Sequence, residues 1–213
     1  MQQHSTERNG LPSGTIRPPL TMLASSNIQE LQQRIAQFDD QSAYKELFSL
    51  FYKSLQQFAY SFVRSHETAE EIVSDVFMKV WKKRAGLSRI QNLKLYLFIS
   101  TKNSALNYLR AQKKPLVPAE QYQVQLQSIY FDPEKLMLTA EMMGRVQKAI
   151  ADLPPRCQLI FKLVKEDGLK YKEVAELLHL SLKTVENQMS TAIKKIGQAI
   201  HFDIRTTLSS RSS

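Results

Sequence analysis

A short polar segment between residues 183 and 194 carries side chains that can read the edges of DNA bases. These side chains are Lys183, Thr184, Glu186, Asn187 and Gln188, with Lys194 two turns farther along. Lysine can bind guanine acceptors or a phosphate, asparagine and glutamine can pair with adenine, and glutamate can accept a hydrogen bond from cytosine. The segment therefore predicts contacts with duplex DNA. An ordinary helical hairpin with a solvated polar face would show the same residue types.

The charge of the chain supports a polyanionic partner. Lysine and arginine number 29 against 20 acidic residues, which leaves a net charge of +9. Residues 28–113 hold 13 basic and 8 acidic residues, and residues 133–213 hold 13 and 9. Because both halves carry the excess, a single basic tail does not explain it. Nucleic acid and an anionic membrane surface are the partners that such a charge favours, although a basic protein without either partner would have the same composition.

Residues that support catalysis or metal binding are few and scattered. The four histidines are His4, His66, His179 and His201, and the single cysteine is Cys157. They form no zinc-type cluster, and no nucleophile–base pair or phosphate-binding loop is recognisable. We therefore expect no metal, no cofactor and no enzymatic activity. One cysteine in an apolar run fits a reducing, cytoplasmic setting. No apolar run approaches the roughly 18–20 residues that span a bilayer, so no membrane insertion is expected.

Apolar residues recur every three or four positions along most of the chain, which predicts an all-α fold. The expected helices span residues 28–37, 40–64, 67–84, 92–113, 133–152, 156–166, 170–178 and 182–201. Asn27, Asp39 or Asp40, and Asp132 are the predicted N-caps of three of them. In the last helix, one continuous buried stripe is expected from Leu182, Val185, Met189, Ile193, Ile196 and Ile200.

These helices divide into two small domains, at residues 27–113 and 133–204. Residues 114–132 contain two prolines and little charge and are predicted to be a flexible linker, and flexible tails are expected at 1–26 and 205–213. The pair 170–178 and 182–201 has the form of a helix-turn-helix. His179 occupies the turn, where glycine often helps the chain reverse, and it can adopt the required backbone with modest strain.

Two sets of motifs resemble bacterial sigma factors of the extracytoplasmic-function group. The runs Ala69–Arg84 and Leu95–Arg110 resemble region two of these proteins. The run Leu153–Arg156, followed by Tyr171–Ala175 and Lys183–Gln188, resembles region four. The order, the spacing and the weakly charged linker also match, and the resemblance covers about residues 28–200.

The resemblance implies that the chain binds the beta and beta-prime subunits of core RNA polymerase and directs it to promoter DNA. Region four would read the −35 element as duplex through Lys183, Thr184, Glu186, Asn187, Gln188 and Lys194. Region two would capture the −10 element as a melted strand, through a loop at 85–91 that receives a flipped base. An anti-sigma factor is a further possible partner.

Within region two the resemblance assigns two surfaces. Polymerase would dock on Glu71, Asp75, Met78, Lys79 and Lys82, although a solvated face with acid–base pairs such as Asp75 and Lys79 has the same spacing. The −10 strand would meet Ser88, Arg89, Asn92, Lys94, Thr101, Asn103, Asn107 and Arg110, with Lys102 on the same polar face. Cations for phosphates and amides for unstacked bases suit a single strand.

Two rival functions share parts of this pattern. A conventional helix-turn-helix regulator would bind an operator duplex without polymerase, and the motifs at 69–84 and 95–110 argue against it. A helical protein-interaction module would need no DNA, and the basic faces on both halves argue against that.

Overall fold

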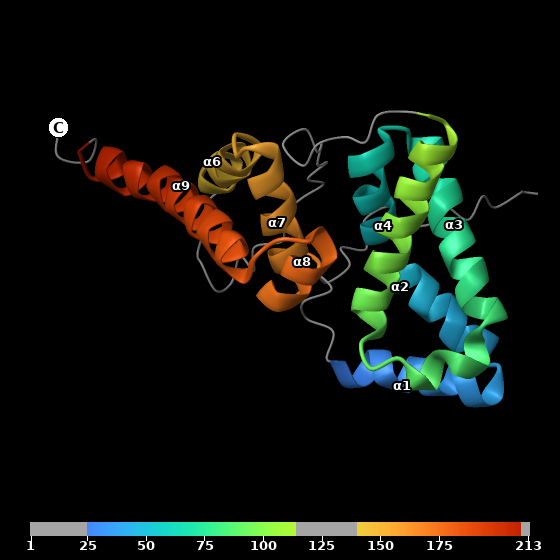
Figure 1. The fold of residues 1–213 in the computed structure, drawn as a ribbon. Coiled ribbons are helices and arrows are strands. Elements are labelled where there is room, and N and C mark those ends of the chain that lie inside the picture. Colours follow the sequence, from blue (N-terminus) through green and yellow to red (C-terminus); the bar gives the residue numbers. More distant parts are fainter. Residues whose placement is uncertain (1–24, 114–139, 210–213) are drawn as a thin grey trace, which may run out of the picture.

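The computed structural model describes residues 25–113 and 140–209, and it confirms the all-α prediction: no strand occurs among these residues. The N-terminal unit, residues 25–113, contains α1 (Ser25–Phe38), α2 (Gln41–Val63), α3 (His66–Lys82), the 3₁₀ helix η1 (Arg84–Arg89) and α4 (Leu93–Ala111). Helices α2, α3 and α4 pack on one another, and α1 crosses one end of them with η1 beside it (Figure 1).

The C-terminal unit, residues 140–209, contains α6 (Ala140–Ala151), α7 (Pro155–Lys165), α8 (Tyr171–Leu178) and α9 (Leu182–Ser209). The long helix α9 packs against α6, α7 and α8. Helix α8 lies on the side of this unit that faces α4 of the N-terminal unit (Figure 1). The predicted linker 114–132 and the predicted helix start at 133 lie outside the described residues. Helix α9 continues beyond its predicted end at residue 201.

Side-chain caps set several helix boundaries. The carboxylate of Asp40 accepts hydrogen bonds from the backbone N–H groups of Ser42 and Ala43, which confirms the predicted start of α2. Ser65 caps α3 by accepting from Thr68 N. Such caps satisfy N–H groups that have no partner inside the helix. The predicted cap at Asn27 is wrong, because α1 begins two residues earlier and Asn27 lies within it.

The core of the N-terminal unit is built on large aromatic and aliphatic side chains. Phe51, Phe58, Phe77 and Phe98 are completely or almost completely buried. The rings of Phe58 in α2 and Phe98 in α4 meet edge to face with centroids 5.2 Å apart. Burial of such a side chain contributes roughly 1.5–3 kcal/mol each, so these contacts hold α2, α3 and α4 as one body.

The buried stripe of α9 differs from the one that the sequence predicts. Val185, Met189 and Ile196 are buried as expected, but Leu182 is 38% exposed and Ile193 is 53% exposed. The side chain of Ile200 lies outside the part of α9 whose side chains are described. Ala192 is completely buried and takes the core position that was expected for Ile193. A small residue there lets α9 approach its neighbours closely, and Ile193 is turned toward solvent.

Candidate nucleic-acid interface

The helix-turn-helix is formed by α8, a turn over residues 179–181 and the start of α9. His179 ends α8 in the left-handed conformation, with φ 54° and ψ 48°, so the histidine adopts the reversal that glycine often provides. Ser181 Oγ then accepts a hydrogen bond from Thr184 N at 3.0 Å and begins α9. Val174 in α8 and Val185 in α9 are both buried, and the two helices pack on each other, which fixes the position of the first turns of α9.

The side chains predicted to face the −35 duplex divide into two groups. Lys183, Asn187 and Lys194 are exposed on α9. Thr184, Glu186 and Gln188 are half-buried: the Thr184 hydroxyl lies 2.8 Å from Ser181 Oγ, and a Glu186 oxygen lies 3.8 Å from Lys183 Nζ. The exposed group is therefore the better placed to reach a ligand, while Thr184 supports the start of the helix through its contact with Ser181.

The outer face of α3 is open along its whole length. The five side chains predicted there are all exposed, and they are Glu71, Asp75, Met78, Lys79 and Lys82. Met78 is 51% exposed, although methionine is usually buried. The opposite face of α3 packs on α2 and α4. An apolar side chain between carboxylates and ammonium groups is a surface that suits a protein partner.

Only part of the polar face of α4 is exposed to solvent. Asn103, Asn107 and Arg110 are exposed, and Arg110 donates a hydrogen bond to Asn107 Oδ1 at 3.0 Å. Thr101 is completely buried and its hydroxyl donates to Leu97 O at 2.9 Å. Its predicted place on the exposed face is therefore wrong. Lys102 is also buried, at 6% exposure, and its Nζ donates to Leu177 O in α8 at 2.6 Å.

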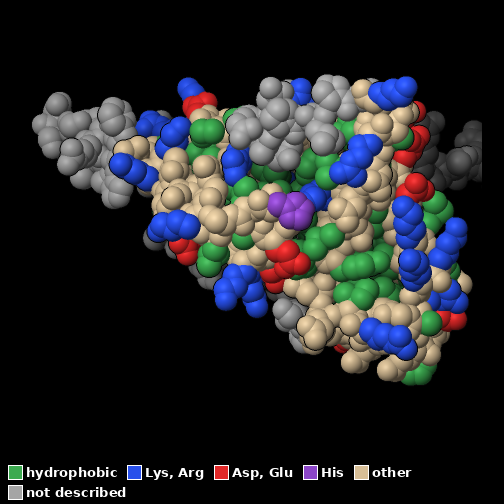
Figure 2. Space-filling view, viewed as in Figure 1, with side chains coloured by type: hydrophobic (Ala, Val, Ile, Leu, Met, Phe, Trp, Pro, Cys, Tyr) green, Lys and Arg blue, Asp and Glu red, His purple; other side chains and the backbone are tan. Residues whose placement is uncertain are grey.

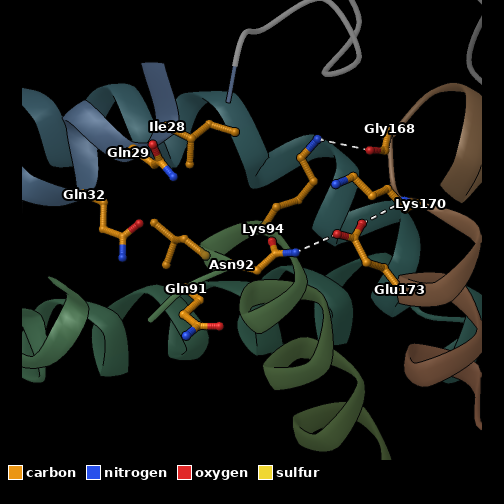
Figure 3. A pocket seen from close by; sticks show the side chains of 10 residues that line it. Ile28, Gln29, Gln32, Gln91, Asn92, Lys94, Gly168, Lys170 and Glu173 are labelled. Atoms are coloured by element: carbon orange, nitrogen blue, oxygen red, sulfur yellow. Dashed lines mark hydrogen bonds between the residues drawn. The ribbon is translucent and has the colours of Figure 1, made fainter. Parts of the chain in front are cut away.

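Three polar side chains of the N-terminal unit bond to the C-terminal unit. Asn92 donates to Glu173 Oε1 at 2.7 Å, and Lys94 Nζ donates to Asp167 O at 3.1 Å. Figure 3 shows the Asn92–Glu173 bond and the longer contact of Lys94 Nζ with Gly168 O, at 3.5 Å. Lys102 makes the third contact, at the other end of α8. Helices α4 and α8 therefore run alongside each other, with polar bonds near both ends of α8.

Burial changes the protonation chemistry of these lysines. Desolvation lowers the pKa of Lys94, and the nearby charges of Asp167 and Glu173 partly oppose that change. Desolvation also lowers the pKa of Lys102. Backbone carbonyl oxygens of the C-terminal unit accept hydrogen bonds from both ammonium groups. These bonds offset the cost of burying a cation, which would be high without acceptors.

A buried charge cluster joins the end of α7 to the loop before α8. Lys162 Nζ lies 2.9 Å from an Asp167 oxygen and 3.6 Å from a Glu166 oxygen, so one ammonium faces two carboxylates. Burial raises the pKa of Glu166 to about 7, because Lys162 only partly offsets that burial and Asp167 adds a second negative charge. Gly168 follows with φ 66°, a left-handed conformation that favours glycine and turns the chain into α8.

The loop at 85–91 is more ordered than the sequence indicated, because Arg84–Arg89 forms the 3₁₀ helix η1. Ser88 and Arg89 are exposed, whereas Leu87 is buried and anchors the loop. Two residues that the sequence did not single out hold this region. One is Glu173, and the other is Gln32, a buried polar residue on the apolar stripe of α1 whose amide reaches the loop. The signal for Gln32 that the sequence offered was a glutamine at a position of the helical repeat where core residues are expected.

Lysine and arginine side chains are spread over both units on the face drawn in Figure 2, with acidic side chains among them. In the described residues no group of three or more histidine, cysteine or acidic side chains could hold a metal ion. Over the same residues, no helix combines the length and the apolar character needed to cross a membrane. The features that stand out are therefore the polar faces of α3, α4 and α9.

Comparison with known families gives two matches, and their positions agree with the two units. The family described as Sigma-70 region 2 matches residues 47–114, and the family described as Sigma-70, region 4 matches residues 143–196. Together the matches cover more than half of the chain. This protein belongs to the sigma-70 family. A sigma factor directs the initiation of transcription, and its partners are core RNA polymerase and promoter DNA.

Curated relatives place this sigma factor in the extracytoplasmic-function group, as the motifs predicted. The chain is 26% identical over 186 residues to the ECF RNA polymerase sigma-E factor of Escherichia coli, covering 83% of this chain and 96% of the relative. It is 22% identical over 189 residues to the RNA polymerase sigma-H factor of Pseudomonas aeruginosa, covering 84% and 96%.

Two solved structures are similar to this sigma factor. One is CnrH in complex with the cytosolic domain of CnrY, with a TM-score of 0.47, 20% identity, and coverage of 83% of this chain and 99% of that chain. The other is the sigma factor RpoE in complex with the anti-sigma factor NepR from Bartonella quintana, with a TM-score of 0.46, 22% identity, and coverage of 75% and 98%.

Proposed function

We propose that this sigma factor reads the −35 element as duplex with α9 and the −10 element as a melted strand with η1 and α4. The observation that carries the first part is the exposed start of α9, which the αL turn at His179 and the cap at Ser181 hold out from the core. Lys183, Asn187 and Lys194 are its leading contacts, with Thr184, Glu186 and Gln188 beside them. The N-terminal part of such a helix is what enters the major groove.

The −10 strand is assigned to the exposed residues between η1 and the end of α4. Ser88 and Arg89 would meet the flipped base, and Asn103, Asn107 and Arg110 would track the strand. Asn92 and Lys94 belong to the same surface, but both bond to the C-terminal unit in the arrangement of Figure 1. Their use in strand binding therefore requires the two units to separate. Thr101 is not included, because it is buried.

Core polymerase is assigned to the outer face of α3. Transcription in vitro with core enzyme alone, and with core enzyme plus this protein, tests the whole proposal on a genomic DNA template. Sequencing the transcripts would identify the promoters. No gain in promoter-specific transcripts would contradict a sigma role, and binding to duplex DNA without polymerase would favour the conventional regulator instead.

The variant Asp75→Arg tests the α3 surface itself. Reversing an exposed charge at the centre of this face should prevent holoenzyme assembly and abolish the transcripts, while the helix content measured by circular dichroism stays the same. Glu46→Arg, an equal charge reversal at an exposed position on α2, is the matched control and should assemble normally. Normal assembly of Asp75→Arg would remove α3 from the polymerase interface.

A further inference from the structure

Gln32 is a polar side chain in the apolar stripe of α1. Ile28, Leu31 and Ile35 share its face and are buried, and Gln32 itself is only 5% exposed. A buried amide is costly unless it is hydrogen-bonded. The side-chain nitrogen of Gln32 donates to two carbonyl oxygens, Leu87 O at 2.5 Å and Ile90 O at 2.7 Å. Both of its amide hydrogens are therefore used on residues more than fifty positions away.

The two acceptors bracket the residues that the proposed function assigns to the flipped base. Ile90 N donates to Leu87 O at 2.9 Å and closes a turn over residues 87–90. Ser88 and Arg89 occupy the centre of this turn and are exposed. The Gln32 amide bridges the first and last carbonyl groups of the turn from the core side, so it sets the backbone that presents the two side chains.

Other contacts fasten the beginning of η1 and the first residue of this turn. The Arg84 guanidinium bonds to the Asp39 carboxylate and lies 4.6 Å from the centre of the Trp81 ring. Leu87 inserts its side chain into the core. At the end of the loop, the Gln32 amide is the polar contact that ties the backbone to α1, and Gln32 also lines the hollow beside Gln91 and Asn92 (Figure 3).

We propose that Gln32 is a positioning residue for recognition of the −10 element. It holds the turn 87–90 in one conformation, so that Ser88 and Arg89 meet a base in a fixed geometry without touching DNA itself. A loop held in its binding conformation loses less conformational entropy when the ligand binds, and it discriminates more sharply between ligands. This inference rests on the proposed function, since it concerns the same loop.

Two substitutions remove the donors without changing the size of the side chain much. Gln32→Glu places a carboxylate against two carbonyl oxygens, and Gln32→Met keeps the volume and adds no charge. Gln33→Glu is the matched control, because Gln33 is the next residue on α1 and is exposed. Helix content and thermal unfolding identify a variant that fails to fold, and Gln32→Met is the variant expected to remain folded.

The assay is transcription by reconstituted holoenzyme from a pool of promoters with a constant −35 element and a randomised −10 element. Sequencing the products gives the base preference at each position. Loss of two hydrogen bonds should reduce the preference at the position read by the loop by about tenfold. Affinity for −35 duplex and the preferences at the other positions should stay unchanged. Unchanged preferences in Gln32→Met, or an equal loss of transcription across the whole pool, would overturn the positioning role.

The double variant Ser88→Ala and Arg89→Ala distinguishes this inference from the proposed function. If the double variant removes the base preference at one position of the −10 element and Gln32→Met reduces the preference at the same position, the positioning role is supported. If the double variant removes this base preference and Gln32→Met leaves it unchanged, only the positioning role fails. If the double variant changes nothing, the loop does not read the −10 element, and both the assignment and the inference are wrong.

Discussion

Lys183 and Asn187 lie one turn apart on the exposed side of α9, directly after the turn that His179 and Ser181 form. Their side chains combine a cation with an amide, which suits one phosphate or guanine contact and one adenine contact. The half-buried Thr184 is already engaged with Ser181. At the scale of single residues, the predicted contacts can therefore be ranked by how exposed their side chains are. Asn187 is the clearest candidate for reading a base.

Asn187→Ala should weaken binding to −35 duplex by about 1–3 kcal/mol if the amide pairs with a base. The measurement is the equilibrium dissociation constant of the full-length protein for a promoter duplex found by transcript sequencing, with single-base variants of that duplex. The loss should concentrate at one base pair. Gln147→Ala, which removes an exposed amide from α6, is the control and should bind normally. Equal affinity of Asn187→Ala for every duplex would exclude a base contact.

At the scale of elements, the loop from α7 to α8 connects the helix-turn-helix to α7 and begins with two acidic residues that face Lys162 of α7. Lys162 is buried with Asp167, and the nearby Glu166 has one oxygen that is buried without a hydrogen-bond partner. A neutral Glu166 leaves a balanced pair of one ammonium and one carboxylate, whereas an ionised Glu166 leaves an excess negative charge in a buried place. Protonation of this side chain therefore favours the folded loop.

Because the folded-state pKa of Glu166 is raised from the ordinary value of 4.5 to about 7, the folded state binds its proton more tightly. The stability that the protonated Glu166 contributes is complete below pH 4.5 and is lost as the pH rises through about 7. The variant Glu166→Gln should therefore be more stable than wild type at pH 8, by up to about 3 kcal/mol. The two should be similar near pH 5.

Urea unfolding of both proteins between pH 5 and pH 8 measures this difference. Glu176→Gln, at an exposed position in α8, is the control and should follow the wild-type pH profile. If Glu166→Gln also shows the wild-type profile at every pH, then Glu166 is ionised in the folded protein without penalty.

At the scale of the whole molecule, α4 and α8 hold the two units together through side chains that the −10 strand would also need. Glu173 is central, because its Oε2 accepts a hydrogen bond from Lys170 N and caps α8, while its Oε1 accepts from Asn92. Lys102 bonds to the opposite end of α8. The cation thus satisfies a carbonyl at the C-terminal end of a helix, where positive charge is favourable. Under the proposed function, DNA and α8 would compete for one surface.

Glu173→Gln should loosen the contact between the units while keeping α8 intact. Lys170 N and Asn92 meet different oxygens of the Glu173 carboxylate, and a glutamine can place its one oxygen at only one of these two positions. Loss of one charge-assisted bond should raise the affinity of the full chain for single-stranded −10 DNA by about threefold to tenfold. Fluorescence anisotropy with a labelled oligonucleotide measures the effect.

The exposed position Glu176 again offers the matched control, since Glu176→Gln makes the same chemical change on α8 without touching α4. Small-angle scattering should show a larger radius of gyration for Glu173→Gln than for this control. Wild-type affinity together with wild-type dimensions would mean that the Asn92–Glu173 bond does not restrain the units.

The sequence by itself determined the all-α class, the order of the helices that the structure describes, and the exposed face of α3. These features follow from local rules: apolar spacing selects the buried side of a helix, and Asp40 and Ser65 cap the helices that follow them. The motif sets of region two and region four also lie within continuous segments. For that reason the family could be recognised before any contact between distant residues was known.

Only the tertiary structure decided the roles of Thr101, Lys102 and Gln32. Helix α4 packs on α2 and α3 and also borders α8, so its polar residues do not all reach solvent, and periodicity cannot show a second covered side. Lys102 bonds to a residue 75 positions away, and Gln32 bonds to residues 55 and 58 positions away. Such burial depends on which segments the fold brings together, and that information is absent from local spacing.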